Sequence, residues 1–349
     1  MSAAQLLLER PPIARDLHPA CFAMVMATGI VSVAAQLRGY PAIARPLLWL
    51  NIGFYAALWC LTAWRIIRYR SNFVADLLDH GRCVGFFTTV AATCVLGNQF
   101  VVVEPRLSAA RGLWIAGVIL WAIVTYGLLT ILTVKQNKPS LSQGINGGWL
   151  VAVVAAQSVA TLGGLLAPKY PTASDAIIYF SLVMWLGGGM LYIWIIALIF
   201  YRYTFFTLEP TQLAPPYWIN MGAMAISTLA GTIFVQNEVD SPLLAELHPF
   251  VLGITLLFWA TATWWIPLLL LLGAWRHVLR HVSLTYDVVY WSAVFPLGMY
   301  TVCTHRLTSL VKQPGLDMIP RYLFWIALFA WALTLLGMIA RVGKLALTR

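Results

Sequence analysis

Charged residues are scarce in this sequence. Asp, Glu, Lys and Arg make up 10% of the 349 residues, while 61% are hydrophobic, and a soluble domain carries about 25% charged residues. So apolar a chain predicts a polytopic membrane protein with membrane lipid around it. Its formal net charge of +10 then reflects orientation in the membrane, and we expect no nucleic-acid partner.

Motifs for metal binding and catalysis are also missing. There is no HExxH, GxSxG, P-loop or dinucleotide-binding pattern, so we expect no enzyme, no cofactor and no metal. Residues 1–17 contain no apolar run long enough for a cleaved signal peptide, so the first membrane helix itself should direct insertion. The cysteines form no CxxC pair and predict no disulfide framework; they are Cys21, Cys60, Cys83, Cys94 and Cys303.

Long apolar segments are abundant instead. Spanning a bilayer takes about 20 apolar residues, and ten segments meet this criterion: 20–37, 43–67, 83–103, 112–134, 146–166, 175–204, 217–236, 249–275, 287–306 and 322–340. Most connections are short, and no polar linker divides the chain. We therefore expect an all-α fold in one transmembrane domain over 1–349, with a ten-helix bundle over 18–343 between a cytoplasmic segment 1–17 and a cytoplasmic tail 344–349.

The loops give the orientation. Lys and Arg are more numerous in the N-terminus, the tail and the loops on their side than in the other loops. This excess places both termini in the cytoplasm. The basic residues would also raise the local anion concentration at that mouth.

Polar residues and tryptophans divide between alternate segments. Ser, Thr, Asn and Gln are denser in the odd-numbered segments, whereas most of the 16 tryptophans lie in the even-numbered ones. Tryptophan favours the lipid interface. We therefore expect five odd-numbered helices inside and five even-numbered helices outside, as two rings.

The polar residues of the odd-numbered segments fall at helical spacing, one stripe to each helix face. Such hydroxyls can bond to a neighbouring helix or line a wet passage, and the sequence leaves both open. Stripes on four of the five odd segments favour a central pore. The residues that we expect to line it are Thr28, Gly29, Ser32, Thr89, Thr93, Gln157, Ser158, Thr161, Asn220, Thr228, Thr232, Gly298 and Thr301.

Charged side chains deep in the segments are lacking. Arg82, Glu104, Asp175, Asp287 and Arg306 all lie near segment ends, and a buried intramembrane charge is the usual sign of proton relays and tight ion coupling. An uncharged path can still favour anions, because breaks at glycine and proline expose backbone N–H groups and helix N-termini carry partial positive charge.

The ninth segment contains WSAVFPLGMYT (291–301), with a proline in its middle. Pro296 removes a backbone hydrogen bond and bends a helix. The ring of Phe295 stands immediately before this bend. On its own the stretch fits a proline kink with an aromatic residue packed against it.

Five stretches resemble one family, the tellurite-resistance/dicarboxylate transporter family, which includes the plant guard-cell slow anion channels. They are HPACFAMVMATGIVS (18–32), NGGWLVAVVAAQSVATLGG (146–164), PPYWINMGAMAISTLAG (215–231), FWATATWWIPL (258–268) and WSAVFPLGMYT (291–301). The resemblance implies ten helices in five hairpins, an inner five-helix pore and a homotrimer with one pore per subunit. It also implies a gate at Phe295 and Pro296, with the phenylalanine plugging the pore.

The resemblance leaves the substrate open, because the family contains proton-linked malate carriers, sulfite exporters, passive anion channels and proteins named for tellurite resistance. We expect passage of small anions (inorganic anions, sulfite or C4-dicarboxylates such as malate) across the cell membrane through a gated pore. The alternative is a proton-coupled dicarboxylate carrier or a tellurite or sulfite exporter. FPLGMYT resembles the carrier-like branch, while the lack of deep carboxylates favours a channel.

Overall fold

The computed structural model describes residues 14–347, which are helical and contain no strand. The expected cytoplasmic segment 1–17 and tail 344–349 lie partly outside the described residues. The all-α prediction is therefore confirmed for the part of the chain that is described.

Two sets of five helices alternate along the chain. The first set, which we call the buried helices, comprises α2 (Ala23–Leu37), α5 (Phe87–Val102), α8 (Val151–Leu166), α10 (Ile219–Gln236) and α13 (Trp291–Val311). The second set, the exposed helices, comprises α3 (Pro41–Arg68), α6 (Leu107–Val134), α9 (Ser174–Phe205), α12 (His248–Ala274) and α14 (Met318–Leu347).

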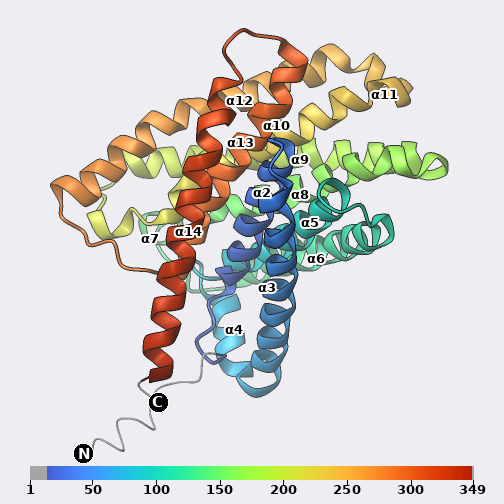
Figure 1. The fold of residues 1–349 in the computed structure, drawn as a ribbon. Helices are drawn as coiled ribbons and strands as arrows, with labels where there is room; N and C mark the ends of the chain where they lie inside the picture. The colour runs from blue at the N-terminus through green and yellow to red at the C-terminus, as the bar shows by residue number, and fades with distance from the viewer. Residues whose placement is uncertain (1–13, 348–349) are drawn as a thin grey trace, which may run out of the picture.

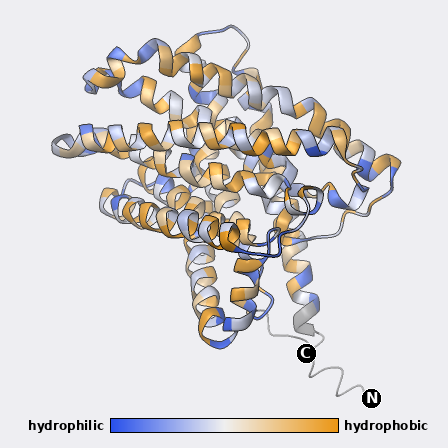
Figure 2. Ribbon diagram, turned by 180° about the vertical axis from the view of Figure 1, so that it is seen from behind, coloured by the Kyte–Doolittle hydropathy of each residue, from blue (hydrophilic) through white to orange (hydrophobic). Residues whose placement is uncertain are grey.

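Nine helices of the described chain are long and apolar enough to cross a membrane. In the windows through α2, α5, α8 and α10, 89 to 94% of the residues are buried, against 17 to 44% in the exposed helices. Figure 2 shows hydrophobic residues along the helices, with hydrophilic ones mostly in loops and at helix ends. The remaining buried helix, α13, contains His305, Arg306 and several threonines and does not meet the apolar criterion.

The buried helices contact both the exposed helices and one another. Each buried helix packs against the exposed helix that follows it, and the buried helices also contact one another in the cyclic order α2, α5, α8, α10, α13 and back to α2. In Figure 1, α14 runs past α13 and α2, which are its contact partners. Neighbours in this cycle are far apart in the sequence, so the chain closes it by packing its last hairpin against its first.

Short helices connect these elements. They are α4 (Arg70–Leu78), α7 (Leu141–Gly144) and α11 (Pro242–Glu246), the 3-10 turns η4 (Ala167–Lys169), η5 (Pro171–Ala173), η6 (Pro210–Gln212) and η8 (Asn237–Asp240), and the π-helical turn η9 (Trp275–Leu279). Helix α4 folds back beside the end of α3 (Figure 1). There the buried Asp76 pairs with Arg65 and Arg82, each at 2.6 Å.

Candidate functional site: two cavities among the buried helices

Each buried helix begins with a short 3-10 turn. The turns are η1 (Pro19–Phe22), η2 (Cys83–Phe86), η3 (Gly147–Leu150), η7 (Pro215–Trp218) and η10 (Val288–Tyr290). Side chains cap three of them: His18 Nδ1 accepts from Ala20 N–H at 3.0 Å, Asn146 Oδ1 from Gly148 N–H at 2.8 Å, and Asp287 Oδ1 from Val289 N–H at 3.0 Å.

These five starts meet around one cavity of about 210 Å³, which we call the vestibule. Every buried helix or its first turn contributes to its wall, and the residues used below are His18, Thr88, Asn146, Gln212, Tyr217 and Ser292. Because all five helices present their N-terminal ends here, the backbone N–H groups and the helix dipoles make this end electropositive.

A buried arginine lies behind the vestibule wall. Arg202, near the end of α9, is 5% exposed. Its guanidinium donates to the carbonyl of Ile145 at 2.7 Å, to the hydroxyl of Tyr217 and to Gln212 Oε1 at 3.4 Å. Tyr217 and Gln212 are themselves vestibule residues. The positive charge therefore reaches the cavity through two polar side chains.

A second cavity lies further along the same five helices. This narrow cavity, with about 10 Å³ of free volume, is lined from α2, α5, α8, α10 and α13. Its wall includes the aliphatic residues Ile30, Val95, Leu229 and Val302 and the polar residues Asn98, Thr161 and Arg306. One water needs about 10–15 Å³ by the same measure, so the axis holds one water at most at this level.

The predicted gate lies between the two cavities along α13. Ser292 lines the vestibule, while Val302 and Arg306 line the narrow cavity. The 3.6-residue period puts Phe295 and Met299 on the same face of α13, at intermediate heights. Phe295 is 1% exposed and Met299 is fully buried. Both side chains are therefore enclosed by the protein at the level between the cavities.

Helix α13 also packs closely at this level. A Cβ atom built on Gly222 of α10 would lie 2.7 Å from Pro296 Cγ, and one built on Gly298 would lie 2.7 Å from Ile30 Cγ2 of α2. Both distances are shorter than real Cβ contacts. The two glycines therefore allow α10, α13 and α2 to approach each other beside Phe295.

Several of the expected pore residues bond to the exposed helices. Thr28 Oγ1 accepts from Trp331 Nε1 of α14 at 3.0 Å, and Ser32 Oγ donates to the Ala44 carbonyl of α3 at 2.7 Å. The hydroxyls of Thr93 and Tyr55 of α3 lie 2.9 Å apart. Similarly, Gln157 Nε2 donates to the Trp185 carbonyl of α9 at 2.9 Å, and Asn220 Nδ2 to the hydroxyl of Tyr203 of α9 at 3.3 Å. Gly29 packs on Val95 of α5, where a Cβ would lie 2.5 Å from Cγ1.

The other expected residues bond within their own helix or its first turn. Hydroxyls donate to a carbonyl three or four residues back in Thr89, Ser158, Thr161, Thr228, Thr232 and Thr301. Of the thirteen expected pore residues, Thr161 alone is among those that line the two cavities. The pore-lining role of the set stays a prediction.

Sequence reasoning missed most of the vestibule. Asn146 and His18 stand immediately before Gly147 and Pro19, and an N-cap residue ahead of an apolar run was the available signal. No local pattern marks Arg202, because its partners lie in two loops, at Ile145 before η3 and at Gln212 and Tyr217 after α9. Met299 could have been predicted, because it lies four residues after Phe295 and therefore on the same face of α13.

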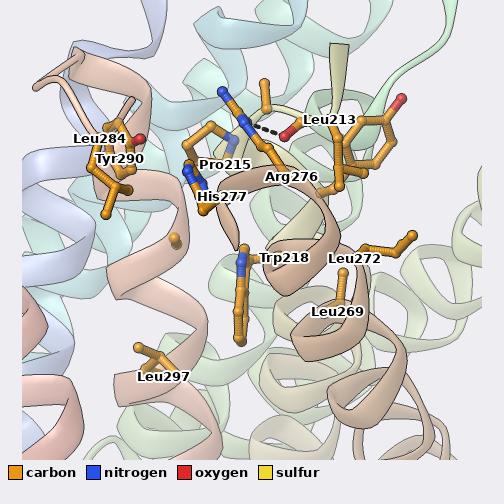
Figure 3. A pocket seen from close by; sticks show the side chains of 14 residues that line it. Leu213, Pro215, Trp218, Leu269, Leu272, Arg276, His277, Leu284, Tyr290 and Leu297 are labelled. Atoms are coloured by element: carbon orange, nitrogen blue, oxygen red, sulfur yellow. Dashed lines mark hydrogen bonds between the residues drawn. The ribbon is translucent and has the colours of Figure 1, made fainter. Parts of the chain in front are cut away.

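A third cavity, of about 260 Å³, lies on the other side of η7. It shares Ala214 and Tyr217 with the vestibule, and the rest of its wall is mainly apolar (Figure 3). That wall comes from the η7 region, from α12 and η9, from the chain between η9 and α13, and from the flank of α13. Arg276 at its rim donates to the Leu213 carbonyl. Because α2, α5 and α8 contribute nothing to its wall, this cavity is not part of the five-helix axis.

A family model described as voltage-dependent anion channel matches residues 16–339. The chain belongs to this family. It is a multi-pass membrane protein of a family of anion transporters and channels, not of enzymes, and the predicted relationship is confirmed.

Some of the similar proteins carry transport names. An uncharacterized transporter of Methanocaldococcus jannaschii is 26% identical over 93% of this chain and 93% of its own length. A sulfite efflux pump of Arthroderma benhamiae is 23% identical over 91% of this chain and 88% of its own length. An uncharacterized membrane protein of Mycobacterium tuberculosis is 38% identical over 44% of this chain and 80% of its own length.

Proposed function

We propose that this protein passes small anions across the cell membrane along the axis of α2, α5, α8, α10 and α13, with Phe295 as the constriction beside the Pro296 bend. The observation that carries this proposal is the pair of cavities, because all five buried helices line both of them. A path through the centre of these helices connects the cavities and passes Phe295.

The chemistry of the walls supports an anion. None of the described residues that line the two cavities is Asp or Glu. The wide end has five helix N-termini and the charge of Arg202 behind it, and Arg306 lines the narrow end. Such a path attracts anions at both ends and offers no carboxylate for proton coupling.

The remaining features of the proposal concern assembly. It includes ten spans in five hairpins, with α13 as the ninth, an inner ring of buried helices within an outer ring of exposed ones, and both termini in the cytoplasm. The burial of the two sets and the cyclic contacts support the rings. A homotrimer with one path per subunit follows from the family resemblance.

The substrate class is narrowed by the relatives. Because some are named sulfite efflux pumps, we place sulfite first among the small anions, with nitrate, chloride and malate as comparisons. The purified protein in liposomes should carry at least one of these anions down its electrochemical gradient at both pH 6 and pH 8. Uphill malate uptake driven by a proton gradient alone would favour the coupled carrier instead. Flux of every anion no faster than in liposomes without protein would refute the proposal.

A further inference from the structure

We infer that the vestibule is a binding site for a small oxyanion. Four side chains in its wall use their acceptor atoms in hydrogen bonds within the protein, and their donor atoms remain available to an anion. The inference rests on the proposed anion path and names the place on it where the anion is held.

Asn146 and His18 each use their acceptor atom in capping. The Oδ1 atom of Asn146 accepts from the Gly148 N–H, which fixes the orientation of the amide and leaves both Nδ2 protons to donate. The Nδ1 atom of His18 accepts from the Ala20 N–H, so this nitrogen carries no proton. The proton of the neutral ring is then on Nε2, which becomes a donor.

Gln212 and Tyr217 also use their acceptor atoms within the protein. The Oε1 atom of Gln212 accepts from the Glu209 N–H at 3.3 Å and from Arg202 at 3.4 Å, so its Nε2 protons remain. The hydroxyl oxygen of Tyr217 accepts from Arg202, so its own proton can be given to another atom. Within residues 14–347, none of these four leftover donors has a hydrogen-bond acceptor.

Arg202 supplies the charge. No carboxylate of the described chain lies within ion-pairing distance of its guanidinium, and its Nε atom has no partner in this part of the chain. A buried charge without a counter-ion is strongly destabilising. An anion in the vestibule would act as the counter-ion through Tyr217 and Gln212, which connect it to the arginine.

Three carboxylates lie near this end, and each is bound to donors of the protein. Asp76 is held between Arg65 and Arg82, Asp79 accepts from the N–H groups of Gly81 and Arg82, and Asp287 caps the Val289 N–H. None of the three is among the residues that line the cavity, so the N-terminal ends of α2, α8 and α10, which carry no acidic cap, supply the positive potential there.

The ligand class follows from the number and direction of the donors. They come from three separate segments of the chain around a cavity of about 210 Å³, whereas one water needs about 10–15 Å³ by the same measure. An ion with several acceptor oxygens, such as nitrate or sulfite, can accept from several of these donors at once. A spherical halide gains less from directional donors spread over such a volume.

Isosteric substitutions test the site. Asn146→Asp and Gln212→Glu keep the acceptor oxygen that the fold uses and replace the donating NH₂ with a negative oxygen. Gln136→Glu is the matched control. It adds the same charge at an exposed position, ten residues before Asn146 in the connection between α6 and α8. Tyr217→Phe removes one donor without adding charge.

The readout is the rise in melting temperature of the purified full chain with sodium nitrate, sulfite or chloride, at constant ionic strength balanced with gluconate. A ligand that binds only the folded state raises this temperature in a concentration-dependent way. We expect nitrate and sulfite to stabilise the wild type more than chloride does. The dissociation constants should rise at least tenfold in Asn146→Asp and Gln212→Glu, severalfold in Tyr217→Phe, and less than twofold in Gln136→Glu.

The result separates this site from the transport proposal. Equal anion stabilisation of the wild type, Asn146→Asp and Tyr217→Phe would overturn the site, even if liposomes carry anions normally. Equal losses of anion affinity in Gln136→Glu and Asn146→Asp would also overturn the site, since a general effect of the added charge would then be responsible. If the binding differences appear while wild-type liposomes carry no anion, the site stands and the transport proposal fails.

Discussion

The two ends of the buried five-helix cluster differ although the same helices build both. At the N-terminal end, polar side chains and 3-10 turns surround a cavity of about 210 Å³, while at the other end mainly aliphatic residues leave about 10 Å³. The five helices run parallel to each other, so every N-terminus lies at one end and every C-terminal half at the other. Parallel packing thus produces an electropositive, wide end and a narrow, mainly aliphatic end to which Arg306 adds a positive charge.

This difference suggests a division of labour along the path. The wide end can replace part of the hydration of an anion with fixed donors. On the proposed path, the narrow end and Phe295 would exclude water, and an anion would have to shed hydration to pass such a constriction. Substitutions at the wide end should then change binding, and substitutions at or beyond Phe295 should change the rate of passage.

The largest expected effect is at the boundary between the two ends. Phe295→Ala should open a gap between the cavities and raise basal anion flux severalfold or more, and Phe295→Leu should raise it less, because a leucine still fills part of the axis. Flux from liposomes and the melting temperature are measured on the same purified variants.

Packing alone gives a different result for Phe295. Truncating a buried phenylalanine costs about 3–5 kcal/mol in soluble proteins, with lower yield and no gain in flux. A destabilised Phe295→Ala protein with unchanged or reduced flux would place the constriction elsewhere, and Met299→Ala would be the next variant to measure.

Arg306 gives the next effect, at the narrow end. Its guanidinium donates to Gln236 Oε1 at 2.8 Å, and its side chain lines the narrow cavity. Arg306→Gln should lower anion flux severalfold, because it removes the positive charge at the narrow end, and should leave nitrate stabilisation of the folded protein within twofold of the wild type. Arg306→Lys, which keeps the charge, should retain most of the flux. A loss of nitrate stabilisation in Arg306→Gln would show that the two ends are one site.

The sequence predicted the helices, the family and the alternation of segments well, because each follows from local patterns. Hydroxyl and amide residues mark helices that must find partners, and those helices are the buried ones. The direction of the stripes was not predictable. On α2, Ile30 lines the narrow cavity while Thr28 lies on the opposite face and bonds to Trp331. A periodic pattern fixes which residues share a face, but the neighbour of that face depends on the tertiary packing.

Tryptophan shows a second limit. We expected the tryptophans of the even-numbered segments at the lipid interface, but Trp185 and Trp331 are buried, and their indole N–H groups donate to Ser227 and Thr28 of buried helices. These two tryptophans therefore hold an exposed helix against a buried one instead of lying at the lipid interface. Arg202 was not predictable, since its partners come from two other loops of the chain.

A smaller effect concerns pH at the wide end. Burial, followed by the charge of Arg82, lowers the pKa of His18 from 6.5 to about 4. Between these values the unfolded chain binds a proton that the folded chain does not bind, so stability is complete above pH 6.5 and falls as the pH decreases toward 4. At pH 5 the loss from this group is about 2 kcal/mol.

His18→Asn tests this effect, because an asparagine can accept from the Ala20 N–H but does not titrate. The melting temperature of the wild type should fall more between pH 7 and pH 5 than that of His18→Asn, with the other histidines common to both proteins. Parallel curves would mean that the pKa of His18 is the same in the folded and the unfolded protein, and the bond that its Nδ1 accepts from the Ala20 N–H would then not hold the ring neutral.

The smallest expected effects come from two threonines, one on each side of the path wall. Thr161 lines the narrow cavity, whereas Thr28 accepts from Trp331 on the far side of α2. Thr28→Val leaves the buried indole N–H without its partner, which should cost about 1–2 kcal/mol of stability with unchanged flux. Thr161→Val removes a hydroxyl from the constricted axis and should lower flux about twofold by making the axis drier, with a smaller change in stability.

Melting temperature and flux measured on both variants decide between the assignments. Reduced flux in Thr28→Val together with normal flux in Thr161→Val would mean that the path follows the hydroxyl stripes, and the two cavities would then not belong to it.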